Sequence, residues 1–189
     1  MNNCIALTFA VFMSVMNLGQ SGSSGPTNKW KDEDIAKFYS NGTKIWTIYT
    51  TWGPSSCKID NVTNNDNRSA TFERRFFSGG QKSPLNLNGT FRNGRKKFRS
   101  TTYDTMDVRE ISGGSYYRTE ELLFTYNDGN CGIFFVGLWG GRGNNYELRV
   151  RNENTTNEDC YKYFVNHTDR AGSGKSRFDC KNITSSYKP

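Results

Sequence analysis

Short segments in which apolar and polar side chains alternate follow one another along most of this 189-residue chain. Between residues 45 and 52, Trp46, Ile48 and Trp52 fall on one face, and Ile45 and Tyr49 fall on the other. A two-residue period is typical of β-strands. Similar segments, each bounded by Gly, Asn, Asp or Pro, lie at residues 57–63, 69–77, 85–91, 97–103, 106–111, 116–126, 132–138 and 146–151. This succession predicts an antiparallel meander, which must close into a barrel or form two sheets because open edges invite aggregation.

Two segments break this pattern and predict helices. Residues 30–39 are amphipathic and carry Asp32, Glu33 and Asp34 in the first turn, where the helix dipole favours acids. Residues 157–166 fit one late helix before a Gly/Ser-rich tail. The aromatic fraction of 14% is high, which suits strands with a buried face and is atypical of disordered chains.

The N-terminal segment is typical of a secretory signal peptide. Residues 1–19 contain no Asp, Glu, Lys or Arg, and an apolar stretch at 5–15 leads into a Gly/Ser-rich stretch. We expect a signal peptide at 1–20, a flexible leader at 21–29 and one domain at 30–189, with a buried helix as the alternative for the first segment. No apolar run reaches the roughly 18 residues that a membrane-spanning helix needs, so we expect no membrane partner.

The number of cysteines is consistent with a secreted protein. Without Cys4, the chain keeps Cys57, Cys131, Cys160 and Cys180, an even number that predicts two disulfides in an oxidising compartment. The four cysteines allow three connectivities. A zinc site is less favoured because the cysteines form no C-x-x-C pair and the only histidine, His167, lies elsewhere. Glycosylation is predicted at sequons that begin at Asn41, Asn61, Asn67, Asn88, Asn154, Asn166 and Asn182.

The net charge of +7 arises from residues 68–118. Residues 68–118 hold eleven Lys or Arg against four acids, whereas the rest of the chain is balanced. The run Arg95–Lys97, with Arg92 and Arg99, could hold heparin or a host protein, and a solvated hairpin is the alternative. Because the chain is expected to be exported, nucleic acid is not expected as a partner.

Several short motifs resemble the tick salivary lipocalins, the histamine-binding protein family. They are residues 34–38 (DIAKF), 45–53 (IWTIYTTWG) before Cys57, 126–131 (YNDGNC), 146–148 (YEL) and 159–164 (DCYKYF) before a final Cys180. Together they cover essentially the whole predicted domain. The order and spacing of Trp52, the cysteines and Glu147 carry the resemblance.

The resemblance implies an all-β fold: an eight-stranded antiparallel lipocalin barrel with a short N-terminal helix, one C-terminal helix and two disulfides. It also implies pairing of Cys57 with Cys180 and of Cys131 with Cys160. In function, it implies a secreted salivary protein that sequesters host inflammatory mediators, such as histamine, serotonin or leukotrienes, and so suppresses host defence. We expect a monomer.

The pattern of the amine-binding members is only partly matched. Those members carry Cys-Asp, and later Glu-Leu followed by Trp or Tyr; here Gly132 follows Cys131, and Arg149 follows Glu147-Leu148. Residues two apart on a strand share a face, so Arg149 can neutralise Glu147. An amine would then find its carboxylate engaged, whereas a ligand with its own carboxylate, such as a leukotriene or fatty acid, would find a guanidinium suited to bidentate contact.

The orientation of this strand stays open in the sequence. Tyr146, Leu148 and Val150 alternate with charged residues, and amphipathicity alone places the charged set in water. The resemblance instead places Glu147 inside. The other candidate ligand-binding residues, for each of which simple packing is the alternative, are Tyr49, Trp52, Glu120, Leu122 and Phe124, where the last three share a face if the strand is regular.

The chemistry that the sequence suggests is binding without catalysis. The single histidine makes a Ser/His/Asp enzyme improbable, and the adjacent Glu120 and Glu121 point to opposite faces of a strand and cannot share a site. No cofactor or metal is expected. The alternative to a ligand-binding barrel is an interaction protein that binds a host protein or glycosaminoglycan through residues 68–118.

Overall fold

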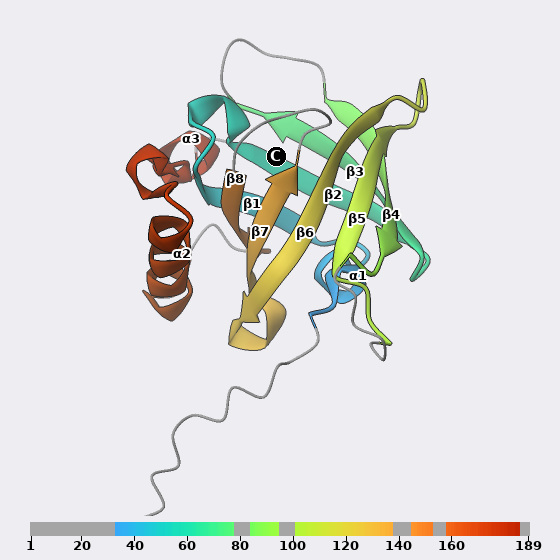
Figure 1. Ribbon diagram of the computed structural model, residues 1–189. Helices are drawn as coiled ribbons and strands as arrows, with labels where there is room; N and C mark the ends of the chain where they lie inside the picture. Colours follow the sequence, from blue (N-terminus) through green and yellow to red (C-terminus); the bar gives the residue numbers. More distant parts are fainter. Residues whose placement is uncertain (1–32, 78–83, 95–100, 138–144, 153–157, 186–189) are drawn as a thin grey trace, which may run out of the picture. The chain divides into compact units, whose positions relative to one another are not determined.

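The structure is a computed structural model that describes residues 33–77, 84–94, 101–137, 145–152 and 158–185 (Figure 1). The predicted signal peptide and leader lie outside the described residues, as does the start of the helix expected from residue 30. Among the described helices, none is long and apolar enough to cross a membrane.

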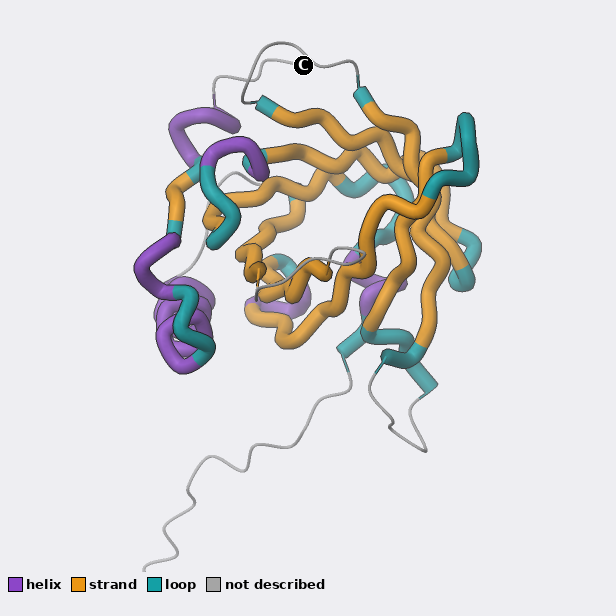
Figure 2. The backbone as a smooth tube through the Cα atoms, turned by 45° about the horizontal axis from the view of Figure 1, so that its top comes forward, coloured by secondary structure: helices purple, strands orange, loops and turns teal. Residues whose placement is uncertain are grey.

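Eight antiparallel strands form the barrel. They are β1 (Lys44–Thr50), β2 (Lys58–Asn65), β3 (Ser69–Phe76), β4 (Leu85–Arg92), β5 (Thr105–Glu110), β6 (Tyr116–Tyr126), β7 (Cys131–Gly137) and β8 (Asn145–Arg151). Each strand pairs with the next along the chain, and β1 pairs with both β2 and β8, so the sheet closes on itself (Figure 2). Closure removes the exposed edges of the meander. The predicted eight-stranded barrel is therefore confirmed.

One predicted strand is wrong in its described part. At the end of the strand expected at 97–103, residues 101 and 102 form bends and Tyr103 is irregular, and the rest of that segment lies outside the described residues. The carbonyl of Tyr103 instead accepts a hydrogen bond from the backbone N–H of Ile35 at 2.8 Å. The Tyr103 backbone therefore helps to hold the helix that begins at Ile35.

That helix, α1 (Ile35–Phe38), is shorter than the predicted 30–39. Asp34 is its N-cap, because its side chain accepts a hydrogen bond from the Lys37 N–H, so it lies before the helix instead of within the first turn. Ile35 and Phe38 are buried in the barrel core, and Asn65 donates to the carbonyls of Ala36 and Tyr39 at the end of the helix. α1 thereby fills one end of the barrel.

The second helix, α2 (Glu158–Arg170), covers part of the outer wall. It contacts β6, β7 and β8, and Figure 1 shows it beside β8. The disulfide Cys131–Cys160 joins it to β7. It continues four residues beyond the predicted end at 166, and Phe164 on its buried side packs against the wall.

The C-terminal tail is more regular than predicted. After the short helix η3 (Gly174–Ser176), β9 (Phe178–Asp179) pairs with β1, and α3 (Lys181–Ser185) follows. The disulfide Cys57–Cys180 ties this segment to the beginning of β2. Two further short helices, η1 (Pro54–Ser56) and η2 (Asn127–Gly129), lie in the β1–β2 and β6–β7 connections. The predicted pair of disulfides and their connectivity are confirmed.

Two apolar cores lie on opposite sides of the barrel wall. One fills part of the barrel interior and includes Phe72, Leu87, Val108, Leu122 and Phe134. The other lies between the wall and α2, and its members include Ile48, Ile133, Leu148, Val150 and Phe164. Strands β7 and β8 therefore have a buried face on both sides, which decides how their side chains are oriented.

Candidate functional site: an ion cluster inside the barrel

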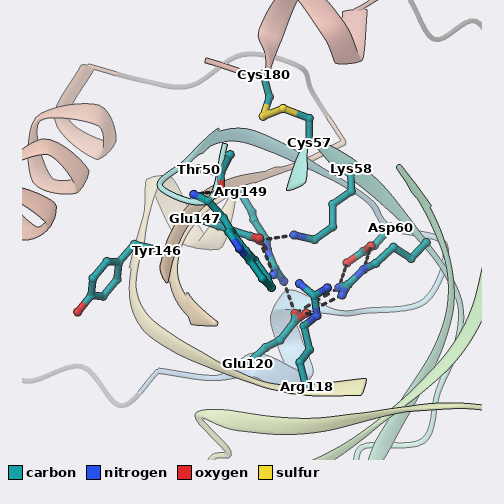
Figure 3. A network of polar contacts seen from close by, with 12 residues as sticks. Thr50, Cys57, Lys58, Asp60, Arg118, Glu120, Tyr146, Glu147, Arg149 and Cys180 are labelled. Carbon is teal, nitrogen blue, oxygen red and sulfur yellow. Dashed lines mark hydrogen bonds and ion pairs between the residues drawn. A yellow bond between two sulfur atoms is a disulfide. The ribbon is translucent and has the colours of Figure 1, made fainter. Parts of the chain in front are cut away.

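The charged side chains of β8 point into the barrel. Tyr146, Leu148 and Val150 pack outward in the core beneath α2, so the alternate residues Glu147 and Arg149 point inward, and both are fully buried. Amphipathicity alone predicts the reverse, and it fails because α2 supplies an apolar partner for the outer face. Figure 3 shows Glu147 and Arg149 inside the ring of strands and Tyr146 outside it.

Six fully buried ionisable side chains meet inside the barrel, and we call them the ion cluster. Its cations come from β2, β3 and β8 and its carboxylates from β2, β6 and β8; the members are Lys58, Asp60, Arg74, Glu120, Glu147 and Arg149. Each is at most 1% exposed, so a water-sized probe scarcely touches them. Three positive and three negative charges balance when all six are ionised.

Arg74 bridges two of the carboxylates. Its Nε and Nη2 donate to Asp60 Oδ1 and Oδ2, both at 2.7 Å, and its Nη1 donates to Glu120 Oε1 at 2.7 Å. The planar guanidinium fits this bidentate geometry, which a lysine could not reproduce. The Tyr39 hydroxyl donates to Asp60 Oδ2 at 2.9 Å, which connects α1 to the cluster.

Arg149 bridges Glu120 to the third carboxylate, Glu147. Its Nη1 donates to Glu120 Oε2 at 2.5 Å, and its Nε donates to Glu147 Oε2 at 2.7 Å. The Lys58 Nζ donates to the same Glu147 Oε2. Among the described residues, the other oxygen, Oε1, is buried and has no hydrogen-bond partner. Glu147 Oε2 therefore accepts hydrogen bonds from both Lys58 and Arg149, whereas Oε1 accepts none from the described residues.

Burial and neighbouring charges shift the pKa values in opposite directions. Burial raises the pKa of Glu147, but Arg149 and Lys58 outweigh it and bring that pKa down to about 2. Burial likewise opposes a low pKa for Glu120, yet Arg149, Arg74 and Lys58 hold it well below its usual range. For Lys58 burial wins: it lowers the pKa to about 7, against the attraction of Glu147. Lys58 is therefore the member whose charge changes near neutral pH.

Burying the ion cluster inside the barrel has a large free-energy cost. Several kcal/mol are needed to desolvate each ion, and apolar side chains of similar volume are often as stabilising as a buried ion pair. Stability alone therefore does not account for six ionised side chains in a protein interior. A few fixed polar groups among apolar walls are also a common feature of ligand sites.

Trp52 and Arg118 lie beside the cluster. Trp52 packs against the interior core, and the Arg118 Cζ lies 5.2 Å from the centre of its ring. The Arg118 Nε is 4.0 Å from Glu120 Oε1. Arg118 is 4% exposed and adds a fourth positive charge to this part of the interior. Trp52 follows β1 by two residues, and its backbone N–H donates to Thr50 Oγ1 at 3.0 Å.

Two predicted site residues do not face the interior. Tyr49 packs outside the wall against Tyr161 and Phe164, with ring centres 4.7 and 6.1 Å away. Phe124 also lies outside, 4.3 Å from the Tyr163 ring of α2. The reason is a break in register in each strand, between Thr47 and Tyr49 in β1 and between Leu122 and Phe124 in β6. An irregularity of this kind changes the face on which the following residues lie.

The other predicted residues face the barrel interior, which settles the orientation that the sequence left open for Glu147 and Arg149. Leu122 is in the interior core, and Glu120 and Glu147 are in the ion cluster with Arg149. Their role in binding a ligand remains a prediction.

Four residues of the site were not predicted from the sequence: Lys58, Asp60, Arg74 and Tyr39. A signal was present in β3, where Arg74 continues the alternation of the buried Ala70 and Phe72. A charged residue in phase with the apolar face of a strand is a candidate for burial. Arg74 was instead counted with the other Lys and Arg residues of 68–118 as part of a basic surface region.

Gly132 shows why the amine pattern is altered. It points inward, opposite Arg149, and a Cβ there would lie 2.8 Å from a ring carbon of Phe38 and 3.0 Å from Leu122 and Phe134 side-chain atoms. An aspartate at this position would require α1 to move. Phe38 thus occupies the space into which that carboxylate would extend.

The basic region is smaller on the surface than its charge count suggests. Arg74 and Arg118 are inside the barrel, and Arg92 pairs with Asp107 at 2.8 Å on the surface. Lys82, residues 95–97 and Arg99 lie outside the described residues. Binding of heparin or a host protein through residues 68–118 remains a prediction.

The sequons differ in accessibility. Asn41, Asn67, Asn166 and Asn182 are exposed, Asn61 and Asn88 are half-buried in strands, and Asn154 lies outside the described residues. Which of them carry glycans remains a prediction, and the exposed ones meet the steric requirement in the folded chain.

Comparison with known proteins identifies the fold. No protein-family model matches the chain. No curated protein sequence matches it significantly. Among solved structures, the bovine lipocalin allergen Bos d 2 is 11% identical with a TM-score of 0.55, over 82% of this chain and 99% of that one. A bovine odorant-binding protein variant is 10% identical with a TM-score of 0.54, over 80% of this chain and 99% of that one. The possum milk whey lipocalin trichosurin is 12% identical with a TM-score of 0.52, over 76% of this chain and 97% of that one. Together with the closed barrel, these similarities show that the chain has the lipocalin fold.

Proposed function

We propose that this protein is a secreted, non-catalytic lipocalin that binds one small ligand in its barrel, and that the ligand carries an acidic group. The observation that supports this is the ion cluster, in which every carboxylate is already bound by a cation. Trichosurin was solved with bound 4-ethylphenol, so a barrel of this fold accommodates a small molecule.

A ligand amine has to compete for its carboxylate. Glu147 accepts from Lys58 and Arg149, and Glu120 accepts from Arg74 and Arg149. An ammonium that displaced one of these cations would leave it buried without compensation, at a cost of several kcal/mol. The same geometry disfavours histamine and serotonin as ligands, although the chain resembles the histamine-binding family.

A ligand acid meets cations that have capacity for another acceptor. An ammonium has three N–H donors, and within the described residues Lys58 uses one of them for Glu147. Lys58 begins β2, after the connection that contains Trp52, and Figure 3 shows its amine reaching toward Glu147. A ligand carboxylate inside the barrel would meet either Lys58 or Arg118, whose Cζ lies 5.2 Å from the centre of the Trp52 ring. Leukotrienes and fatty acids have this chemistry.

The biological setting belongs to the same proposal. The signal-like N-terminus, the sequons and the disulfides are consistent with a glycosylated protein in an oxidising compartment. We propose that it sequesters host inflammatory mediators and thereby suppresses host defence, as the resemblance to tick salivary lipocalins implies. Each molecule would hold one mediator without changing it chemically.

Calorimetric titration with leukotriene B4, histamine and serotonin tests the proposal. We expect leukotriene B4 to bind, and Lys58→Met to weaken it at least about tenfold, because a buried charge partner is lost. The control is Lys162→Met, whose amine is on the surface of α2 with 61% of the side chain exposed. Tight histamine binding that Glu147→Ala abolishes would contradict the choice of an acidic ligand, and binding of none of the three would contradict the proposal that the barrel holds such mediators.

A further inference from the structure

A small pocket lies outside the ion cluster, at the end of the barrel that α1 fills. Its volume is about 50 Å³, which is room for about four water molecules. Figure 1 shows α1 and the β6–β7 turn at the same end of the barrel. The pocket is lined by the charged residues Asp34, Lys37, Asp128 and Arg151 and, among others, by Phe38 and Gly129. No member of the ion cluster lines it, so it is a separate place for a ligand.

The four charged residues of this pocket have both signs and are not paired with one another. Lys37 and Arg151 are positive, and Asp34 and Asp128 are negative. Within the described ranges of the chain, no ion pair joins any of the four side chains to another charged group. The pocket therefore offers two positive and two negative groups to a ligand.

Arg151 provides the most restricted of these groups. It is half-buried, its Nη2 donates to Ser40 Oγ at 2.7 Å, and its Nε is buried without a hydrogen-bond partner among the described residues. Its Nη1 lies beside Gly129, because a Cβ added to that glycine would be 3.8 Å from it.

The guanidinium also lies near an apolar wall, since its Cζ is 5.9 Å from the centre of the Phe38 ring. Burial lowers the pKa of Arg151, and no carboxylate offsets this effect. A guanidinium that is partly removed from water and has no anionic partner is well suited to a planar carboxylate.

The acidic side of the pocket has a fixed geometry. Asp34 caps α1, with its Oδ1 accepting a hydrogen bond from the Lys37 N–H at 3.0 Å. Asp128 is exposed in the turn η2 and has a φ of 53°, a left-handed conformation that aspartate adopts more readily than most residues. Both carboxylates are therefore carried by short, defined backbone segments, where they would meet an ammonium group.

We propose that this pocket binds a small zwitterion, a free α-amino acid, with its carboxylate on Arg151 and its ammonium on Asp128. A simple anion would pair with Arg151 but be repelled by Asp34 and Asp128, and a simple amine would be attracted and repelled in the opposite sense. A molecule with both charges satisfies both sides. This inference does not depend on the ligand proposed for the barrel.

The size of the pocket sets what is recognised. A volume of about 50 Å³ accommodates the ammonium and carboxylate of an amino acid but not a large side chain. The side chain of the ligand would therefore extend into solvent, and recognition would rest on the two charged groups. Glycine, which consists of little else, is the appropriate probe.

The experiment is an NMR titration of the full secreted protein, labelled with ¹⁵N in its arginines, with glycine. The resonance followed is the Arg151 Nε–H, assigned with Arg151→Lys. We expect a saturable shift with a dissociation constant in the millimolar range, as is reasonable for so small a ligand. N-acetylglycine lacks the ammonium and glycine methyl ester lacks the carboxylate. Each should bind at least about tenfold more weakly, because one charged hydrogen bond is lost.

Two variants test the assigned roles. Asp128→Asn keeps a residue that tolerates a positive φ, and it should weaken glycine about tenfold while leaving N-acetylglycine no weaker, because that analogue has no ammonium. A merely structural role of Asp128 would weaken both. Arg151→Gln should weaken glycine to a similar extent, whereas Arg170→Gln, which changes an exposed arginine at the end of α2, should leave it unchanged.

Three results would overturn the proposal: no saturable shift with glycine, binding of acetate or N-acetylglycine as tight as that of glycine, or a shift at Arg170 equal to that at Arg151. The first two are measured on the wild-type protein, so they decide even if Arg151→Gln fails to fold.

Discussion

Single residues decide what the interior can hold, and Gly132 is the sharpest case. Its missing side chain lets Phe38 approach β7, so that α1 can fill one end of the barrel. At the same time it removes the acid that the amine-binding pattern has at this position. One residue thus links the packing of α1 to the acidic ligand that we propose.

We expect Gly132→Ala to destabilise the protein by about 1–3 kcal/mol, the usual cost of overpacking a core. The added Cβ would lie 2.8 Å from Phe38 and 3.0 Å from Leu122 and Phe134, and all three side chains belong to the interior core. Gly137→Ala is the matched control, because a Cβ there meets its nearest atom at an ordinary 3.6 Å. Urea unfolding measures both. Equal stability of the two variants would show that the contact with Phe38 is not restrictive.

Glu147 gives a prediction for pH. Its pKa is lowered in the folded protein from the usual 4.5 to about 2, so the stability that it contributes is present above pH 4.5 and is lost as the pH falls toward 2. Glu120 acts in the same direction. We expect the free energy of unfolding to fall by about 3 kcal/mol or more over this range.

Urea unfolding at several pH values tests this, and Glu147→Gln should reduce the pH dependence. The control Glu158→Gln removes a fully exposed carboxylate whose ion pair is at the surface of α2, and it should change the dependence little. A wild-type free energy that stays flat from pH 4.5 to 2 would contradict an ionised cluster.

At the level of elements, the strands were predictable and the faces of their residues were only partly so. Alternation and turn residues located most of the strands in β1–β8, because local sequence determines where an extended segment begins and ends. The face that is buried depends on what covers it. In β8, α2 covers the apolar face, and no feature of residues 146–151 alone contains that information.

Irregular pairing limited the rest of the site prediction. Phe124 was placed on the face of Glu120 and Leu122 on the assumption of a regular two-residue period, and the register break in β6 moved it outside. Tyr49, another pocket candidate, lies outside after the register break in β1. Arg74 was counted as part of a surface charge, although its phase with Ala70 and Phe72 marked it as inward. The disulfide pairing came from the resemblance, since four cysteines alone leave three choices.

The two disulfides connect different elements and close loops of different length. Cys57–Cys180 spans 123 residues and holds the C-terminal segment to β2, whereas Cys131–Cys160 spans 29 residues and holds α2 to β7. Loop-closure entropy grows with the logarithm of loop length, so the longer loop should stabilise more, by about 1 kcal/mol.

We therefore expect replacement of both Cys57 and Cys180 by serine to lower the unfolding free energy more than replacement of both Cys131 and Cys160. Thermal unfolding of the two double variants measures the order. In the second variant α2 should also become more susceptible to proteolysis, because its covalent link to the wall is gone. A larger loss of stability in that variant would show that packing of α2 outweighs the chain entropy of the longer loop.

At the scale of the whole molecule, the barrel separates two environments. Outside the wall, α2 and the strands form an apolar core of the usual kind. Inside it, an apolar core surrounds ionised groups that come from four strands. The closed sheet is what allows this, because it holds charges from β2, β3, β6 and β8 at fixed positions away from water. A ligand in the barrel would meet these preorganised charges, and its charge would add to theirs.

The pKa of Lys58 tests this account most directly, because it reports both the burial of the amine and the charge of a bound ligand. It can be followed by NMR of the lysine side-chain resonances, with Lys58→Arg for assignment. We predict a midpoint near 7 in the unliganded protein and a rise when leukotriene B4 is added, because an acid beside the amine favours its protonated form. A midpoint near 10.5, unchanged by the ligand, would contradict the account.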